Sequence, residues 1–206
     1  MGMKNIKVVT LVSIASLLAV ASSPIIASAA ANTANTTINA SVADVISITT
    51  GTTVALSLTP TAGGVVSSSS DTVTVNTNRT SGYNLSIADS DATTTLASGG
   101  NTFAAHSGTK TAPTALANNT WGFAVATSTT GIGTNGFDAS YSTETNAGSS
   151  TSKWAGMPAS GSPIMLKTTA AVATNDTTTV WFAAKATSSQ PGGTYTDTVT
   201  YTATTN

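Results

Sequence analysis

Few side chains in this 206-residue chain are suited to acid, base or metal chemistry. His106 is the only histidine, and cysteine is absent, which excludes thiolate nucleophiles and cysteine zinc sites. A serine–histidine–aspartate triad would have to use His106, but no Gly-x-Ser-x-Gly turn occurs in the sequence. We therefore expect His106 to be a loop histidine without a catalytic role.

Asp89 and Asp91 are two residues apart. Such a pair could serve a glycosidase, or could give oxygen ligands to calcium together with Ser90. The pair flanks the end of a predicted strand, and no EF-hand loop accompanies it, so we expect a solvated turn. Its spacing places Asp197 on the same face as Val199. A carboxylate that points inward needs a partner such as a backbone amide, a tyrosine hydroxyl or a lysine. A position of Asp197 at the edge of the sheet is the simpler interpretation. The sequence thus predicts no catalytic residue, no cofactor and no metal.

Three aromatic residues stand in a long stretch, residues 127–163, that is rich in Gly, Ser and Thr. They are Phe137, Tyr141 and Trp154. One interpretation is a loop whose aromatics close a satellite cluster over one end of the fold. The other is a binding face on which these candidate ligand-binding residues stack on sugars.

The rest of the chain alternates apolar and polar residues with the period of two that is typical of half-buried strands. Asn78–Gly82 is predicted to join two such strands as a hairpin loop. No alternation of strands with helices, as a parallel sheet needs, is visible. The predicted strands are centred on Val54–Leu58, Val73–Val75, Tyr83–Ile87, Trp121–Val125, Val180–Phe182 and Tyr195–Ala203.

This pattern predicts an all-β fold, an antiparallel β-sandwich that is immunoglobulin-like or jelly-roll-like, with a closed barrel as the alternative. A single domain is expected over residues 32–206, with the stretch at about 127–163 as a long insertion.

The N-terminus has the features of a cleaved secretory signal peptide over residues 1–31. Lys4 and Lys7 precede an uncharged apolar run, Val8–Val20, which is short for a membrane span. Small residues suited to signal peptidase follow at Ala27, Ala29 and Ala31. We expect a secreted chain that begins near Asn32 and has no membrane span.

Only 7% of the residues are charged, against roughly 25% in ordinary soluble domains. Without Lys4 and Lys7, five basic residues remain against eight acidic ones, a net charge near −3. Nucleic acid is excluded as a partner, because no basic patch is available to displace counterions from phosphates. Electrostatic binding to a membrane surface is excluded for the same reason.

Two stretches carry a family resemblance. In Val73–Ile87 a strand and a polar turn are followed by Gly82-Tyr83-Asn84-Leu85, and in Pro191–Tyr201 a turn is followed by Gly-Thr-Tyr and alternating Thr and Val. Together they resemble the WxL-type domains of bacterial surface proteins, which associate non-covalently with the cell wall, although Tyr201 stands where that family has a second Trp. The second stretch is also similar to the last strand of spore-coat-U-like and pilus-subunit domains, which are secreted β-sandwiches.

These observations lead us to expect a non-catalytic, exported structural or adhesive protein of the bacterial cell surface, self-assembling or wall-associated. Its partners would be copies of itself, other surface proteins or cell-wall glycan. The alternative is a carbohydrate- or wall-binding module that uses the aromatics of the 127–163 insertion. Thr36–Val42 would either pair within its own sheet, the simpler expectation, or be a strand exchanged between subunits.

Overall fold

The computed structural model describes residues 31–125 and 153–206, and the regular secondary structure in this part of the chain is entirely β. The all-β prediction is therefore confirmed at the level of fold class. Two units are distinguished, Met1–Ser41 and Val42–Asn206, and all the strands belong to the second. Residues 1–30 of the expected signal peptide, and Phe137 and Tyr141, lie outside the described residues. No described helix is long and apolar enough to cross a membrane.

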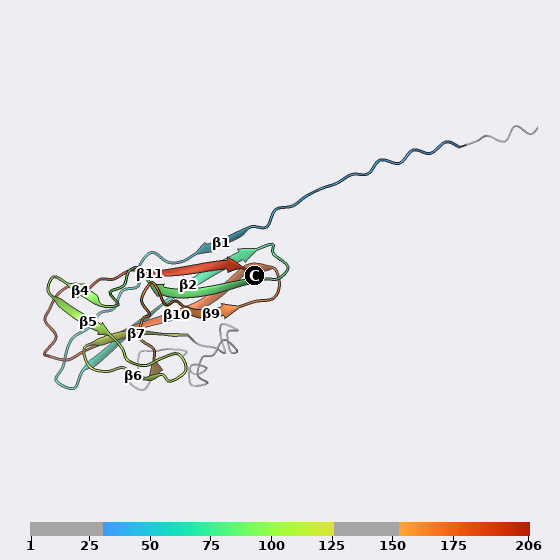
Figure 1. Ribbon diagram of the computed structural model, residues 1–206. Helices are drawn as coiled ribbons and strands as arrows, with labels where there is room; N and C mark the ends of the chain where they lie inside the picture. Colours follow the sequence, from blue (N-terminus) through green and yellow to red (C-terminus); the bar gives the residue numbers. More distant parts are fainter. Residues whose placement is uncertain (1–30, 126–152) are drawn as a thin grey trace, which may run out of the picture. The chain divides into compact units, whose positions relative to one another are not determined.

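The larger sheet has six strands in the order β1-β2-β10-β7-β5-β4 (Figure 1). The long strands β2 and β10 form its centre, paired antiparallel from Val65 opposite Ala186 to Thr77 opposite Ala173. The pairing of β5 with β7 is parallel, and the other pairings are antiparallel. The strands of this sheet are β1 (Ile46–Thr49), β2 (Val65–Thr77), β4 (Leu96–Ser98), β5 (Asn101–Ala105), β7 (Thr120–Val125) and β10 (Ala173–Ala186).

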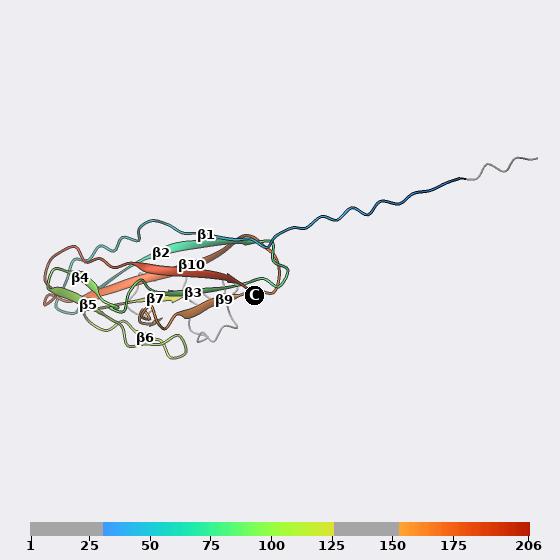
Figure 2. The same ribbon diagram turned by 45° about the horizontal axis from the view of Figure 1, so that its top comes forward.

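A three-stranded antiparallel sheet has the order β11-β3-β9, with β3 (Tyr83–Asp89) between β9 (Ile164–Thr168) and β11 (Val199–Thr205). A further pair joins β6 (Thr114–Ala115) to β8 (Lys153–Trp154). Buried side chains of β3 and β9 form one core cluster with those of β2, β7 and β10. The strands β3, β9 and β11 lie alongside the larger sheet in Figure 2, so the arrangement is sandwich-like.

The core follows from the alternation that the sequence displays. In β2 the buried residues are Val73, Val75 and Thr77, and their neighbours in sequence are more exposed. In β3, Tyr83, Leu85 and Ile87 have no exposed surface. Because successive side chains of a strand point to opposite faces, these patterns specify which face is turned inward.

The predicted hairpin at Asn78–Gly82 is wrong. The segment connects β2 to β3, but these strands belong to different sheets, so it crosses between the layers. The Asn78 side chain also binds an earlier segment. Its amide N–H donates to the Ala43 carbonyl at 2.9 Å, and its amide oxygen accepts from the Val45 N–H at 2.8 Å. Polar turn residues show where the chain changes direction, but not which strand the next one pairs with.

Two predicted strands are extended without forming a full ladder. Val54, Leu56 and Leu58 alternate in burial with their neighbours and pack on the core, yet residues 52–60 are not in a strand. At the C-terminus, alternation begins at Tyr195 as expected, but the strand starts only at Val199. Alternation indicates which side chains are buried. A ladder requires, in addition, a neighbouring strand at hydrogen-bonding distance.

Candidate functional site

Trp154, the candidate stacking residue in the described part of the chain, is fully buried. It lies in β8 and belongs to the core cluster. The next residue, Ala155, exchanges two backbone hydrogen bonds with Phe123 of β7, at 2.8 and 2.9 Å. The ring of Trp154 has no face open to a sugar, so this part of the binding-face interpretation is corrected: Trp154 is a core residue.

Close backbone contacts fix the position of this segment. A Cβ atom added at Gly156 would lie 1.8 Å from the carbonyl oxygen of His106. We expect Gly156→Ala to lower the free energy of unfolding by about 1–3 kcal/mol, since backbone must move to make room. Urea denaturation measures this effect. The matched control is Gly161→Ala, where nothing lies within 4 Å of the added Cβ; equal stability of the two variants would contradict the packing described here.

His106 is buried beside the same segment, just after β5. Its Nδ1 accepts a hydrogen bond from the Ala117 N–H at 3.3 Å, so the Nε2–H is left to donate to the Thr114 hydroxyl at 2.8 Å. Burial lowers the pKa of His106 below its usual value. The ring is therefore neutral near pH 7, and both of its nitrogens serve structural contacts.

The acidic residues are not arranged as the sequence suggested. Asp89 was expected in a solvated turn, but only 1% of its surface is exposed. Burial and the neighbouring Asp89 and Asp91 raise the pKa of Asp197 to about 6, although the Thr198 N–H donates to its Oδ1 at 2.7 Å. The spacing correctly placed Asp197 on the half-buried face of its segment, but local sequence does not reveal its proximity to Asp89.

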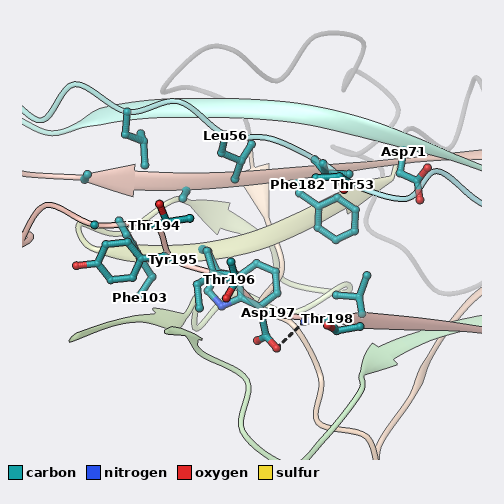
Figure 3. Close-up of a pocket in the computed structure, with 18 of the residues that line it drawn as sticks. Thr53, Leu56, Asp71, Phe103, Phe182, Thr194, Tyr195, Thr196, Asp197 and Thr198 are labelled. Atoms are coloured by element: carbon teal, nitrogen blue, oxygen red, sulfur yellow. Dashed lines mark hydrogen bonds between the residues drawn. The ribbon is translucent and has the colours of Figure 1, made fainter. Parts of the chain in front are cut away.

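The second unit contains an apolar groove of about 640 Å³. The large sheet contributes Phe182, Ala184 and Ala186 from β10, and the extended segment 52–60 contributes Val54, Leu56 and Leu58. The C-terminal residues 190–199 and Tyr201 also line it. Figure 3 shows Leu56 and Phe182 on one side of this space and Tyr195, Thr196 and Asp197 on the other.

Aromatic contacts hold the C-terminal side of the groove in place. The rings of Phe103 and Tyr195 meet edge to face with centroids 4.8 Å apart. The Tyr195 hydroxyl donates to the Pro191 carbonyl at 2.7 Å, and the Trp121 indole N–H donates to the Thr94 carbonyl at 2.9 Å. These hydrogen bonds satisfy the polar atoms of the aromatic rings and leave their apolar surfaces to line the groove.

The groove has little charge. Asp71 lies at its wall, where it accepts hydrogen bonds from the Thr50 hydroxyl and, at 2.9 Å, from the Gly51 N–H. Burial, and then the nearby Asp71, raise the pKa of Tyr201 well above its usual value, so its hydroxyl stays neutral. Apart from Asp71 and Asp197 the lining is uncharged, which favours an uncharged, largely apolar occupant.

The two sides of the groove are extended chain rather than complete strands. Residues 52–60 and most of 190–198 have no ladder partner, although Thr196 forms an isolated bridge with Ala97. Unpaired extended backbone beside an apolar groove can accept an additional strand by main-chain hydrogen bonding. Sequence reasoning missed the groove because its lining comes from segments far apart in the chain; the alternation at Val54–Leu58 was the only local signal.

Comparison of the chain with protein-family models, with curated protein sequences and with solved structures gave no match.

Proposed function

We propose that this chain is a non-catalytic, exported structural protein of the bacterial cell surface that associates with copies of itself. The N-terminal segment Thr36–Val42, here called the arm, is the strand supplied to another copy, and the apolar groove receives it. Export is supported by the signal-peptide pattern of residues 1–31, and the surface setting by the low charge and the resemblance to surface β-sandwiches.

The observation that carries this proposal is the exposure of the arm's apolar side chains. Residues 31–41 are exposed and have no secondary structure. Ile38 is 84% exposed and Val42 is 83% exposed. These two apolar side chains of the arm are thus open to contact with a partner.

The arm has the pattern of a strand with one apolar face. Ile38, Ala40 and Val42 alternate with Thr37, Asn39 and Ser41, so one face would be apolar and the other polar. No charged residue occurs between Ala31 and Ala43. The arm is thus compatible with a groove whose lining is apolar and carries only the carboxyl groups of Asp71 and Asp197.

Assembly can be tested with charges placed on the two faces of the arm. In residues 32–206, Ile38→Asp with Val42→Asp is expected to abolish regular oligomers or filaments, because two carboxylates would have to enter an apolar groove. Thr37→Asp with Ser41→Asp adds the same charge to the polar face and is the matched control. Size-exclusion chromatography and negative-stain microscopy measure assembly. A monomeric wild-type chain, or equal assembly by both variants, would contradict the proposal.

Deletion of residues 32–42 should likewise leave a folded monomer, and loss of folding would show that the arm serves its own subunit.

Because the chain has no cysteine, engineered pairs of cysteines can locate the arm. A chain with Ile38→Cys or Ala40→Cys, mixed with a Leu56→Cys chain, is expected to form a disulfide-linked dimer. Ala55→Cys is the control, since Ala55 is exposed whereas Leu56 lines the groove. If the arm cysteine formed a disulfide with the Ala55→Cys chain but not with the Leu56→Cys chain, the arm would lie outside the groove.

A further inference from the structure

We propose that the hydrogen-bonded carboxyl groups of Asp89 and Asp197, here called the carboxyl pair, are a pH-sensitive switch that holds the C-terminal side of the groove in place in acid. The switch regulates the site that the proposed function uses, so its effect on assembly rests on that function. Its effect on folding does not, because both carboxyl groups belong to one copy of the chain.

The carboxyl pair joins the C-terminal side of the groove to the smaller sheet. Asp89 ends β3, and Asp197 lies two residues before β11 and lines the groove. Backbone hydrogen bonds hold the two segments together: the Ser90 N–H donates to the Thr198 carbonyl at 2.9 Å, and the Asp89 N–H donates to the Pro158 carbonyl at 2.8 Å. A change in the interaction between the two carboxyl groups therefore acts on the segment that forms this side of the groove.

The hydrogen bond within the carboxyl pair requires a proton. Oδ1 of Asp89 accepts from the Asp91 N–H at 3.1 Å, and Oδ1 of Asp197 accepts from the Thr198 N–H at 2.7 Å (Figure 3). Oδ2 of both residues is buried, and no N–H or O–H of the described residues donates to it. The two side chains hydrogen-bond to each other. Since an ionised carboxylate only accepts hydrogen bonds, one of the two groups must be protonated.

The groups around Asp197 determine when this proton is lost. Burial, and then the side chains of Asp89 and Asp91, raise the pKa of Asp197 to about 6, although the hydrogen bond from the Thr198 N–H opposes the shift. Both acidic neighbours come from β3 and the residues just after it. Residues 158–160, which bind the backbone of both, carry no titratable side chain. An ionised Asp197 would therefore lie buried beside like charge.

Protonation of the carboxyl pair favours both folding and assembly. Because folding raises the pKa of Asp197, the protonated group stabilises the fold at low pH, and this stabilisation is lost as the pH rises through about 6. Above that pH the two adjacent carboxylates repel each other. An arm in the groove would bury Asp197 further, so assembly would take up a proton and would be favoured by acid.

Urea denaturation tests the switch within a single copy. The chain used is residues 32–206 with Ile38→Asp and Val42→Asp, which is monomeric under the proposed function. Its unfolding midpoint is expected to fall between about pH 5 and about pH 7.5 relative to the same chain with Asp197→Asn. The asparagine amide donates to Asp89 at every pH, so that variant has no proton to lose at this position.

Other titrating groups, His106 among them, contribute to both chains and cancel in this comparison. Asp89→Asn should remove the relative fall as well, because an amide donor then stands beside Asp197. Asp44→Asn, which removes a carboxylate from an exposed pair with Arg79, is the matched control and should keep the fall. The same pH dependence with and without Asp197→Asn would overturn the switch.

Assembly of residues 32–206 without the arm substitutions gives the second readout. Sedimentation is expected to show assembly about tenfold weaker at about pH 7.5 than at about pH 5, within the limit of a tenfold change per pH unit for one proton. Asp197→Asn should assemble equally at both. Equal assembly of the wild type at both would overturn the regulation and leave the proposed function intact. Absence of assembly at either pH would contradict the proposed function, while the single-copy measurement would still decide the switch.

Discussion

Replacing Trp154 with alanine is expected to lower the free energy of unfolding by about 3–5 kcal/mol. The side chain is fully buried in the core cluster and is among the largest there. Alanine would remove the apolar contacts of the indole and leave a cavity that the anchored segment around Ala155 cannot readily fill. Urea denaturation, followed by circular dichroism, measures the loss as a lower midpoint.

The matched control is Trp181→Ala. Trp181 lies in β10 and is only partly buried, so the same substitution is expected to have a smaller effect. If Trp154→Ala kept full stability but lost binding to cell-wall glycan, the ring would have to face solvent, and the core position described here would be contradicted. A destabilised variant with unchanged wall retention would support the assignment of Trp154 to the core.

Removing the carboxylate of Asp176 is expected to destabilise the fold by about 3–5 kcal/mol, because one group holds two buried partners. The Lys167 ammonium lies 2.6 Å from its Oδ1, and the Tyr83 hydroxyl donates to its Oδ2 at 2.8 Å. Only 9% of the Lys167 side chain is exposed. Asp176→Ala would leave a buried ammonium and a buried hydroxyl without partners. Chemical denaturation at pH 7 measures the effect.

Two comparisons make this prediction specific. Asp44→Ala breaks the pair with Arg79, whose side chains are 49% and 43% exposed, and it is expected to cost less than about 1 kcal/mol because solvent screens that pair. Lys167→Met combined with Asp176→Leu should be more stable than Asp176→Ala, since no unpaired ammonium remains. Equal losses for Asp44→Ala and Asp176→Ala would show that the Lys167–Asp176 pair is not buried as described.

Strand faces were the part of the fold that could be predicted from sequence. Val73 with Val75, and Tyr83 with Leu85 and Ile87, are buried as their alternation indicated. Burial of alternate side chains is a local property of an extended chain. The all-β fold class followed from the same local signal.

The arm and the alternation of Val54–Leu58 could be recognised from the sequence, but the groove could not be predicted from it. The groove exists because residues 52–60 and 190–198 lie beside the large sheet without completing strands of their own. Whether extended backbone gains a ladder partner depends on residues far away in the chain, and period-two spacing contains no information about them.

The sequence by itself determined that the described part of this chain is β, that little of the chain is charged, and which residues of β2 and β3 face inward. The tertiary structure alone decided that Asn78–Gly82 crosses between sheets and that Trp154 belongs to the core. It also decided that the carboxyl groups of Asp89 and Asp197 meet. Local spacing fixes the direction in which side chains point, whereas contacts between distant segments arise only when backbone hydrogen bonding and burial are satisfied across the whole fold.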